Sequence, residues 1–472
     1  MTELPPTSEN QSYESNSVSI GARLSELAWV FTKLGITGFG GPAAHIAMIE
    51  TEVVTKRQWL TREALLDLLG ISNLLPGPNS TELAIHIGLL RGGWRGLVVA
   101  GVCFILPAML LVWGLAIGYA QYQALPQVEA VFYGVKPVII GIIAQAVWKL
   151  GKSLFKRRLM IVATGLAVGL VYLQLHEVLV LIATGLLVIA WDSYRIYQLR
   201  TSSRNSAKNT AQKINKNIEP DALTVNSGNT NPESMNPENS RESIAENTSL
   251  EATSHDHVNS HSRHGEKYNQ YNKYAPWLAL PILPLGLVKP MANFASRPEV
   301  WVVFAIFLQI GFVLYGGGYV LFAFLQQQLV ERNHWLTSQQ LIDAIAIGQF
   351  TPGPLFTTAT FVGYLLAGHG GAIGATIGIF LPAFICVGLV SPLVPYLRGS
   401  VITGKFLDGV NCGALALMIA VTFELGQQIL VNGMLWVITV ITWLVLYRYP
   451  KFNSILLVIG GAVFGVIYRT FS

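Results

Sequence analysis

The chain has 472 residues, of which 52% are hydrophobic and 12% are charged, and its mean hydropathy is +0.47. Soluble domains carry roughly 25% charged residues, so the composition excludes an ordinary soluble protein and indicates an integral membrane protein. The net charge of +5 comes with no basic face that alternates with aromatic residues, so nucleic-acid binding is not predicted. The three cysteines lie in apolar segments without metal-ligand or disulfide spacing.

The apolar segments predict an all-α, polytopic membrane protein of about 13 transmembrane helices. A polar N-terminal tail (1–22) without a cleavable signal peptide is followed by six spans, at 24–49, 68–90, 96–119, 127–149, 158–175 and 176–194. The segment 196–274 is predicted to be a disordered linker, because it cannot bury enough apolar surface to fold. A short segment (275–291) then precedes six further spans, at 300–325, 341–367, 371–396, 402–424, 427–447 and 453–470.

One motif occurs twice, 276 residues apart. Trp59 matches Trp335 and Asp67 matches Asp343, and the Pro-Gly-Pro triplet at 76–78 matches a second triplet at 352–354. Self-similarity at a fixed offset is the signature of an internal repeat. We therefore predict two homologous repeats, at residues 23–195 and 299–472.

The positions of Lys and Arg predict the orientation, because cytoplasmic loops are enriched in both. The densest cluster, at 149–158, places that loop, the N-terminus and the linker in the cytoplasm. If 276–290 crosses the membrane, the later cations are cytoplasmic as well, and if it does not, they lie outside: Arg398, Lys405, Arg448 and Lys451. Crossing is favoured. It inverts the second repeat relative to the first and places a substrate site near the midplane at their interface.

Both repeats carry helix-breaking residues inside apolar segments. The glycine clusters either line a substrate site or allow close helix packing; they comprise Gly38, Gly40, Gly41 and Pro42, and Gly316, Gly317 and Gly318. A helix N-terminus is predicted after each Pro-Gly-Pro triplet, and its free N–H groups suit an anion. The predicted anion-binding residues there are Pro76, Gly77, Pro78, Asn79, Ser80 and Thr81, and Pro352, Gly353, Pro354, Thr357 and Thr358. The alternative is a pair of kinks whose hydroxyl groups bond to their own helices.

Lys136 lies deep in an otherwise uncharged span and is predicted to bind the anion, with snorkelling to the interface as the alternative. The repeat places Asn411 at the equivalent position, and we include it in the site. Four ionisable residues are candidates for proton coupling or, equally, for satisfied polar groups at helix ends: His45, Glu82, His86 and Asp408.

The two helices that follow the WLT sequences are predicted to be amphipathic, partly interfacial and structural, with Thr61 and Thr337 as N-caps. The linker histidines are interpreted as a solvated tail rather than a metal site: His255, His257, His261 and His264. The sequence contains no Walker A loop, GxSxG elbow, HExxH helix or CxxC pair, so we predict no catalytic residue, metal or cofactor.

Five ordered segments resemble the chromate ion transporter (CHR) family of the long, two-domain type: FGGPAAHIAM (39–48), LPGPNSTELAIHIG (75–88), GVKPVIIGI (134–142), GGGYVLFAFLQ (316–326) and TPGPLFTTATFVGYLLAG (351–368). The resemblance covers both halves and leaves out the N-terminal tail and the linker. It implies two homologous domains of opposite orientation in the plasma membrane. It also implies export of chromate from the cytoplasm, driven by protons or the membrane potential.

Several alternatives stay open at this stage. Sulfate is a tetrahedral dianion like chromate, and some family members are associated with sulfur metabolism, so a sulfate transporter is the second hypothesis. A membrane-embedded enzyme that uses His45, Glu82 and His86 is a third, and a sensor with the linker as its output is a fourth. The assembly state, including a homodimer, is left open.

Overall fold

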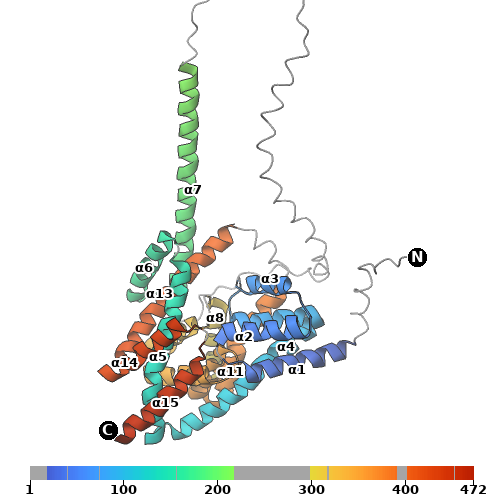
Figure 1. The fold of residues 1–472 in the computed structure, drawn as a ribbon, viewed down its shortest axis with the longest axis vertical. Helices are drawn as coiled ribbons and strands as arrows, with labels where there is room; N and C mark the ends of the chain where they lie inside the picture. Colours follow the sequence, from blue (N-terminus) through green and yellow to red (C-terminus); the bar gives the residue numbers. More distant parts are fainter. Residues whose placement is uncertain are drawn as a thin grey trace, which may run out of the picture. The chain divides into compact units, whose positions relative to one another are not determined.

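The computed structural model describes residues 19–39, 41–73, 75–155, 157–216, 298–315, 318–390, 401–450 and 452–471. Within these ranges the chain is helical and has no β-strand (Figure 1). Six of the described helices are long and apolar enough to cross a membrane: Asn79–Tyr122, Pro126–Leu154, Glu177–Arg195, Leu355–Leu389, Ile402–Ile429 and Ser454–Phe471. The predicted all-α, polytopic membrane fold is confirmed. The count of 13 spans stays a prediction, and segment 275–291 lies outside the described residues.

The chain divides into two compact units. The first comprises residues 1–191 and 282–472 and contains both repeats. In the second, 192–281, the described part is the continuation of helix α7 (Glu177–Lys216). Disorder was predicted from residue 196, but 196–216 is helical, because Ala, Arg, Lys and Gln in this stretch favour a helix. The rest of the linker, including its histidines, lies outside the described residues.

The predicted breaks in the first repeat are present. Helix α1 (Ile20–Thr37) ends at Gly38, and α2 (Gly41–Glu50) then runs into the π-helical turn η2 (Thr51–Lys56). Helix α3 (Arg62–Ser72) is separated from α4 (Asn79–Tyr122) by the first Pro-Gly-Pro loop. The breaks expected inside the apolar segments 24–49 and 68–90 thus fall at the glycine cluster and at the Pro-Gly-Pro triplet.

The second repeat has the same element order with one addition, the short 3-10 helix η6. Its elements are α8 (Val300–Val313), α9 (Val320–Leu325), η5 (Gln326–Arg332), α10 (Ser338–Phe350), η6 (Leu355–Thr357) and α11 (Thr358–Val390). Local backbone details recur as well. Gln58 and His334 both have positive φ, 51° and 53°. The residue after each, Trp59 or Trp335, donates its N–H across 2.8 Å to a carbonyl of the preceding π-helical turn. The predicted caps at Thr61 and Thr337 are confirmed, the second as a capping box.

Both long helices fold back on themselves at a glycine, α4 at Gly93 and α11 at Gly368, where φ is 59° and 61°. A Cβ added at Gly88 would overlap the carbonyl oxygen of Gly96, and the equivalent Gly363 makes the same kind of contact in α11. The two arms of each helix therefore pack antiparallel, as a helical hairpin.

The first arm of α4, from Asn79 to Gly92, is about 21 Å long at 1.5 Å per residue. The hydrocarbon core of a bilayer is about 30 Å thick, so this arm is too short to cross it alone. The arm begins at the first Pro-Gly-Pro loop and ends at the hairpin turn. It is thus a half-helix, as the sequence predicts.

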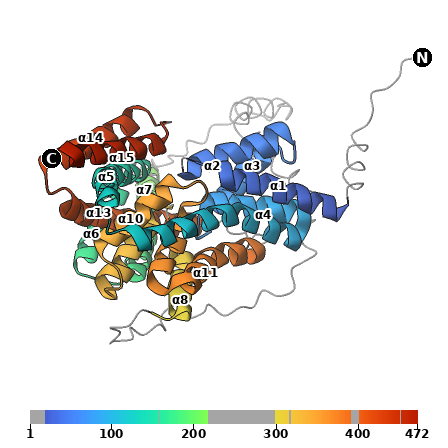
Figure 2. The same cartoon turned by 90° about the horizontal axis from the view of Figure 1, so that it is seen from below.

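The two repeats are interlaced. Helix α5 (Pro126–Leu154) of the first repeat packs against α14 (Gly433–Arg448) and α15 (Ser454–Phe471) of the second, as Figure 2 shows. Helix α13 (Val401–Ile429), the equivalent of α5, packs against α6 (Arg158–Tyr172) and the beginning of α7. Each repeat therefore contributes one long helix to the other, and the repeats are not two separate bodies.

We expect Gly88→Ala to lower the melting temperature in detergent, because the added Cβ would meet backbone that has no room to move. Overpacking of this kind costs about 1–3 kcal/mol. Gly114→Ala is the matched control on the same helix, because a Cβ there meets nothing within 4 Å. Equal melting temperatures for the two variants would contradict the hairpin contact.

Candidate functional site

The two repeats exchange backbone hydrogen bonds at their broken segments. In the first Pro-Gly-Pro loop, Gly77 N–H donates to the carbonyl of Leu314 after α8, across 3.0 Å. In the second, Gly353 N–H donates to the carbonyl of Gly38 after α1, across 2.7 Å. The donors are 276 residues apart and so are the acceptors, so the two bonds are equivalent. We call these four residues the loop crossing.

Glycine is required at both donors. Gly77 has φ of 136° and Gly353 has φ of 99°, a region that residues with a side chain rarely adopt. A Cβ at Gly353 would also overlap the side chain of Ala108 on α4. Close approach of the two repeats therefore depends on the missing side chains.

His45 makes one side of the loop crossing polar. It lies on α2 and is only 2% exposed. Its Nε2 is 2.9 Å from the Gly38 carbonyl and its Nδ1 is 3.4 Å from Ser80 Oγ. The tautomer with a proton on Nε2 donates to Gly38 and leaves Nδ1 to accept from Ser80. The second repeat has Leu321 at the equivalent position, and leucine has no polar side-chain atom that could bond to the Leu314 carbonyl.

Unpartnered polar groups gather at the start of α4. Thr81, Glu82 and His86 are all buried, with exposures of 0%, 0% and 1%. Within the described part of the chain, Thr81 Oγ1, both carboxyl oxygens of Glu82 and His86 Nε2 have no hydrogen-bond partner. The Glu82 carboxyl lies against Gly77, where an added Cβ would touch it. Buried polar atoms are normally paired, so this cluster is a candidate for a ligand or water site.

The second repeat differs at its predicted anion residues. Thr357 Oγ1 donates to the Pro354 carbonyl across 2.8 Å, and Thr358 Oγ1 donates to the Leu355 carbonyl across 2.9 Å. Here the alternative interpretation holds, because both hydroxyl groups bond back to their own segment. Gly318 packs against Leu355 of η6.

The remaining predicted residues lie in several places. Gly40, Gly316 and Gly317 are outside the described residues, and Gly41 and Pro42 open α2. Pro76, Pro78, Pro352 and Pro354 flank the crossing glycines, and Asn79 donates to Asn73 across 2.6 Å. Asp408 and Asn411 are half-buried on α13, on either side of Gly409, which contacts the Thr184 carbonyl of α7.

Lys136 is buried and paired, so the snorkelling alternative does not hold. Its Nζ lies 3.0 Å from Asp343 Oδ1, and the Tyr119 hydroxyl donates to Asp343 Oδ2 across 2.7 Å. Lys136 is 8% exposed and Asp343 is 4% exposed. The three side chains come from α5, α10 and α4, so the ion pair joins the two repeats.

Sequence reasoning missed the role of Asp343. It assigned the helix to an amphipathic, partly interfacial element, which is wrong for α10, because every residue from Leu341 to Ala346 is buried. A carboxylate in the apolar run LIDAIAIG was the available signal. Burial of a charge without a partner is costly, so this run alone indicates that Asp343 either has a counter-ion elsewhere in the chain or binds a proton.

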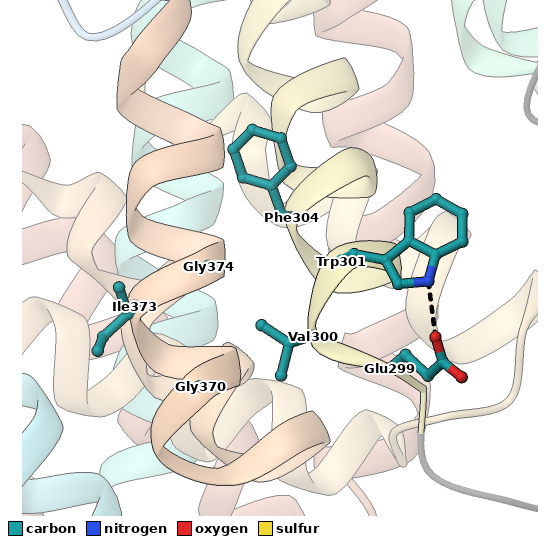
Figure 3. Close-up of a pocket in the computed structure, with 7 residues that line it drawn as sticks. All are labelled: Glu299, Val300, Trp301, Phe304, Gly370, Ile373 and Gly374. Atoms are coloured by element: carbon teal, nitrogen blue, oxygen red, sulfur yellow. Dashed lines mark hydrogen bonds between the residues drawn. The ribbon is translucent and has the colours of Figure 1, made fainter.

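Figure 3 shows a groove on α8 and α11 that does not suit an anion. Val300, Phe304 and Ile373 make its lining mainly apolar. Its carboxylate, Glu299, accepts a hydrogen bond from Trp301 Nε1 across 2.7 Å. We therefore place the candidate site at the loop crossing and the start of α4.

The chain is similar in sequence to known proteins. The sequence model of a family described as chromate transporter matches residues 25–189 and again 301–466. A probable chromate transport protein of Synechococcus elongatus is 27% identical, over 94% of this chain and 95% of its own length. Chromate transport proteins of Cupriavidus metallidurans (26% identical, 94% and 93%) and Pseudomonas aeruginosa (29% identical, 84% and 80%) are similar too. No solved structure matches.

We expect Lys136→Ala to destabilise the protein by about 3–5 kcal/mol, because it leaves the buried Asp343 carboxylate without its cation. Glu129→Gln is the control, since it breaks the exposed ion pair with Arg469 and should cost under about 1 kcal/mol. Thermal unfolding in detergent measures both. A smaller loss for Lys136→Ala than for Glu129→Gln would show that the buried pair contributes little.

Proposed function

Because the chain belongs to the chromate transporter family, we propose that it exports chromate from the cytoplasm through the loop crossing. The family match spans both repeats, and the relatives named above are chromate transport proteins. The family is one of transporters, so a membrane-embedded enzyme is not the function that we propose. In this proposal the protein lies in the plasma membrane with its N-terminus and linker in the cytoplasm, as the Lys and Arg positions predict.

The observation that carries the proposal is the unpartnered polar cluster beside the loop crossing. Chromate is a tetrahedral dianion and needs several hydrogen-bond donors. The first turn of α4 offers the N–H groups of Asn79 and Ser80, which precede the first intrahelical bonds, and the Thr81 hydroxyl. The positive end of the helix dipole favours an anion at the same place.

In this proposal, anion binding depends on the protonation state of Glu82. A carboxylate beside Gly77 repels a dianion, whereas a protonated carboxyl group is a donor. Glu82, His45 and His86 are therefore the coupling candidates nearest the loop crossing. Asp408 is less well placed, since its neighbour Gly409 packs on α7.

The membrane potential suits export. Moving one charge across 100 mV is worth about 2.3 kcal/mol, so a dianion leaving a negative interior gains about 4.6 kcal/mol per 100 mV. Proteoliposomes loaded with chromate, under an imposed proton gradient or potential, test this. We expect chromate efflux that either gradient accelerates, with sulfate added as a competitor. Absence of chromate flux under both gradients would refute the proposal, and flux of sulfate alone would point to the sulfate transporter.

We expect Thr81→Val to raise the KM for chromate about 10–100-fold, the equivalent of one hydrogen bond to a charged ligand. Its melting temperature should stay unchanged, because the hydroxyl group has no partner to lose within the described chain. Thr357→Val is the matched control, since that hydroxyl bonds to the Pro354 carbonyl, and its KM should stay near wild type. The reverse order of KM values would move the anion to the second repeat.

A further inference from the structure

We propose that Asp343 is an internal counter-ion that holds Lys136 while the carrier is empty, gives way to the transported anion, and binds a proton as it does so. The inference rests on the proposed function and deepens it, because it assigns a proton-binding residue and a second anion contact. Lys136 was expected to meet the anion, but Asp343 was not expected to take part.

The geometry of the pair leaves the ammonium group able to change partners. Lys136 Nζ is 3.0 Å from Asp343 Oδ1, and within the described structure this is the one ion pair of either group. The ammonium group has three hydrogens and one carboxylate oxygen as its partner, so it has donors left for an anion. A tetrahedral oxyanion presents four acceptor oxygens and two negative charges, so it competes well for such a cation.

The other carboxyl oxygen is fixed. The Tyr119 hydroxyl donates to Asp343 Oδ2 across 2.7 Å and holds the side chain in place when Lys136 leaves. Oδ1 then faces a buried environment without a cation, where the charged form is strongly disfavoured. Oδ1 accepts one proton, and Lys136 exchanges one carboxylate contact for one oxyanion contact. The proton comes from solvent and forms an O–H bond on Oδ1; no other covalent bond changes.

Most of the other titratable groups on the elements packed against α10 have partners of their own. On α11, His369 packs against Trp113 and Tyr364. Besides Tyr119 from α4 and Lys136 from α5, the packed elements η5 and α15 also carry charged or titratable side chains. These have their own partners: Arg332 pairs with Glu177, Glu331 interacts with Glu424, Arg469 pairs with Glu129, and Tyr468 stacks on Tyr133. Glu82 and His86 on α4 have no hydrogen-bond partner in the described structure, so they are the competing proton acceptors, and the Asp343→Asn variant distinguishes them from Asp343.

The pair is linked to the loop crossing by two elements. Asp343 lies in the middle of α10, and this helix ends at Phe350, directly before the second Pro-Gly-Pro loop with Gly353. Tyr119 lies on the second arm of α4, the arm whose Ala108 contacts Gly353. A shift of α10 when the ion pair opens would thus reach the Gly353–Gly38 hydrogen bond.

The test is calorimetric titration of chromate into the purified full-length protein, repeated in buffers of different ionisation enthalpy to count bound protons. We expect wild type to take up about one proton per chromate, and its affinity to rise on acidification by up to about tenfold per pH unit. Asp343→Asn should bind chromate without that proton, and its affinity should lose this part of the pH dependence. Protonation of chromate itself contributes equally to both proteins, so the difference in proton uptake between wild type and Asp343→Asn measures the proton bound by Asp343.

Three results overturn the inference. Proton uptake by Asp343→Asn equal to that of wild type assigns the proton elsewhere, and chromate binding by wild type without proton uptake removes the exchange but leaves the proposed function. If Asp343→Asn does not fold, the double variant Lys136→Gln, Asp343→Asn, in which both side chains are neutral, replaces it. Normal transport by the double variant would show that the pair is only structural. Loss of transport in a folded double variant supports the exchange. Failure of wild type to bind or carry chromate is different, because it refutes the proposed function itself.

Discussion

Two backbone hydrogen bonds, each from a Pro-Gly-Pro loop to the broken helix of the other repeat, are the constraint on which the rest of the molecule depends. In a bilayer an unpaired N–H or C=O group costs several kcal/mol, so a helix breaks there only if protein satisfies the open backbone. Gly77 supplies a donor to Leu314, and Gly353 supplies one to Gly38. Each repeat thus stabilises the break in the other, and the interlaced long helices keep the two breaks together.

The repeats share a backbone but not their side chains. In the first repeat, His45 and Ser80 surround the Gly38 carbonyl, and Glu82 lies against Gly77. In the second, the hydroxyl groups of Thr357 and Thr358 are used within their own segment. The backbone that the two repeats share therefore forms the scaffold, and the side chains that differ between them form the candidate site. The Lys136–Asp343 pair combines both, because each repeat contributes one charge.

Features that depend on local chemistry were predictable from the sequence. A Pro-Gly-Pro triplet cannot continue a regular helix and a cluster of glycines weakens one, so the breaks at Pro76 and Gly38 followed from the residues, as did the cap at Thr61. A single proline is not enough, since Pro137 lies inside α5. The turn at Gly93 followed as well, because Arg91, Gly92, Gly93 and Arg95 separate the predicted spans 68–90 and 96–119. The partner of Lys136 was hidden, since it lies on α10 of the other repeat and only packing brings the two together.

A counter-ion built into the protein solves a problem that every anion carrier meets. A bare lysine among apolar side chains would be costly in the empty state and would hold an anion too tightly in the loaded state. The Lys136–Asp343 pair is neutral overall, so under our proposal the return of the empty carrier moves no net charge on this pair. In the proposed exchange the loaded site holds a dianion, one ammonium group and a neutral carboxyl group, and is negative overall. The membrane potential then acts on the loaded step alone and favours its outward direction.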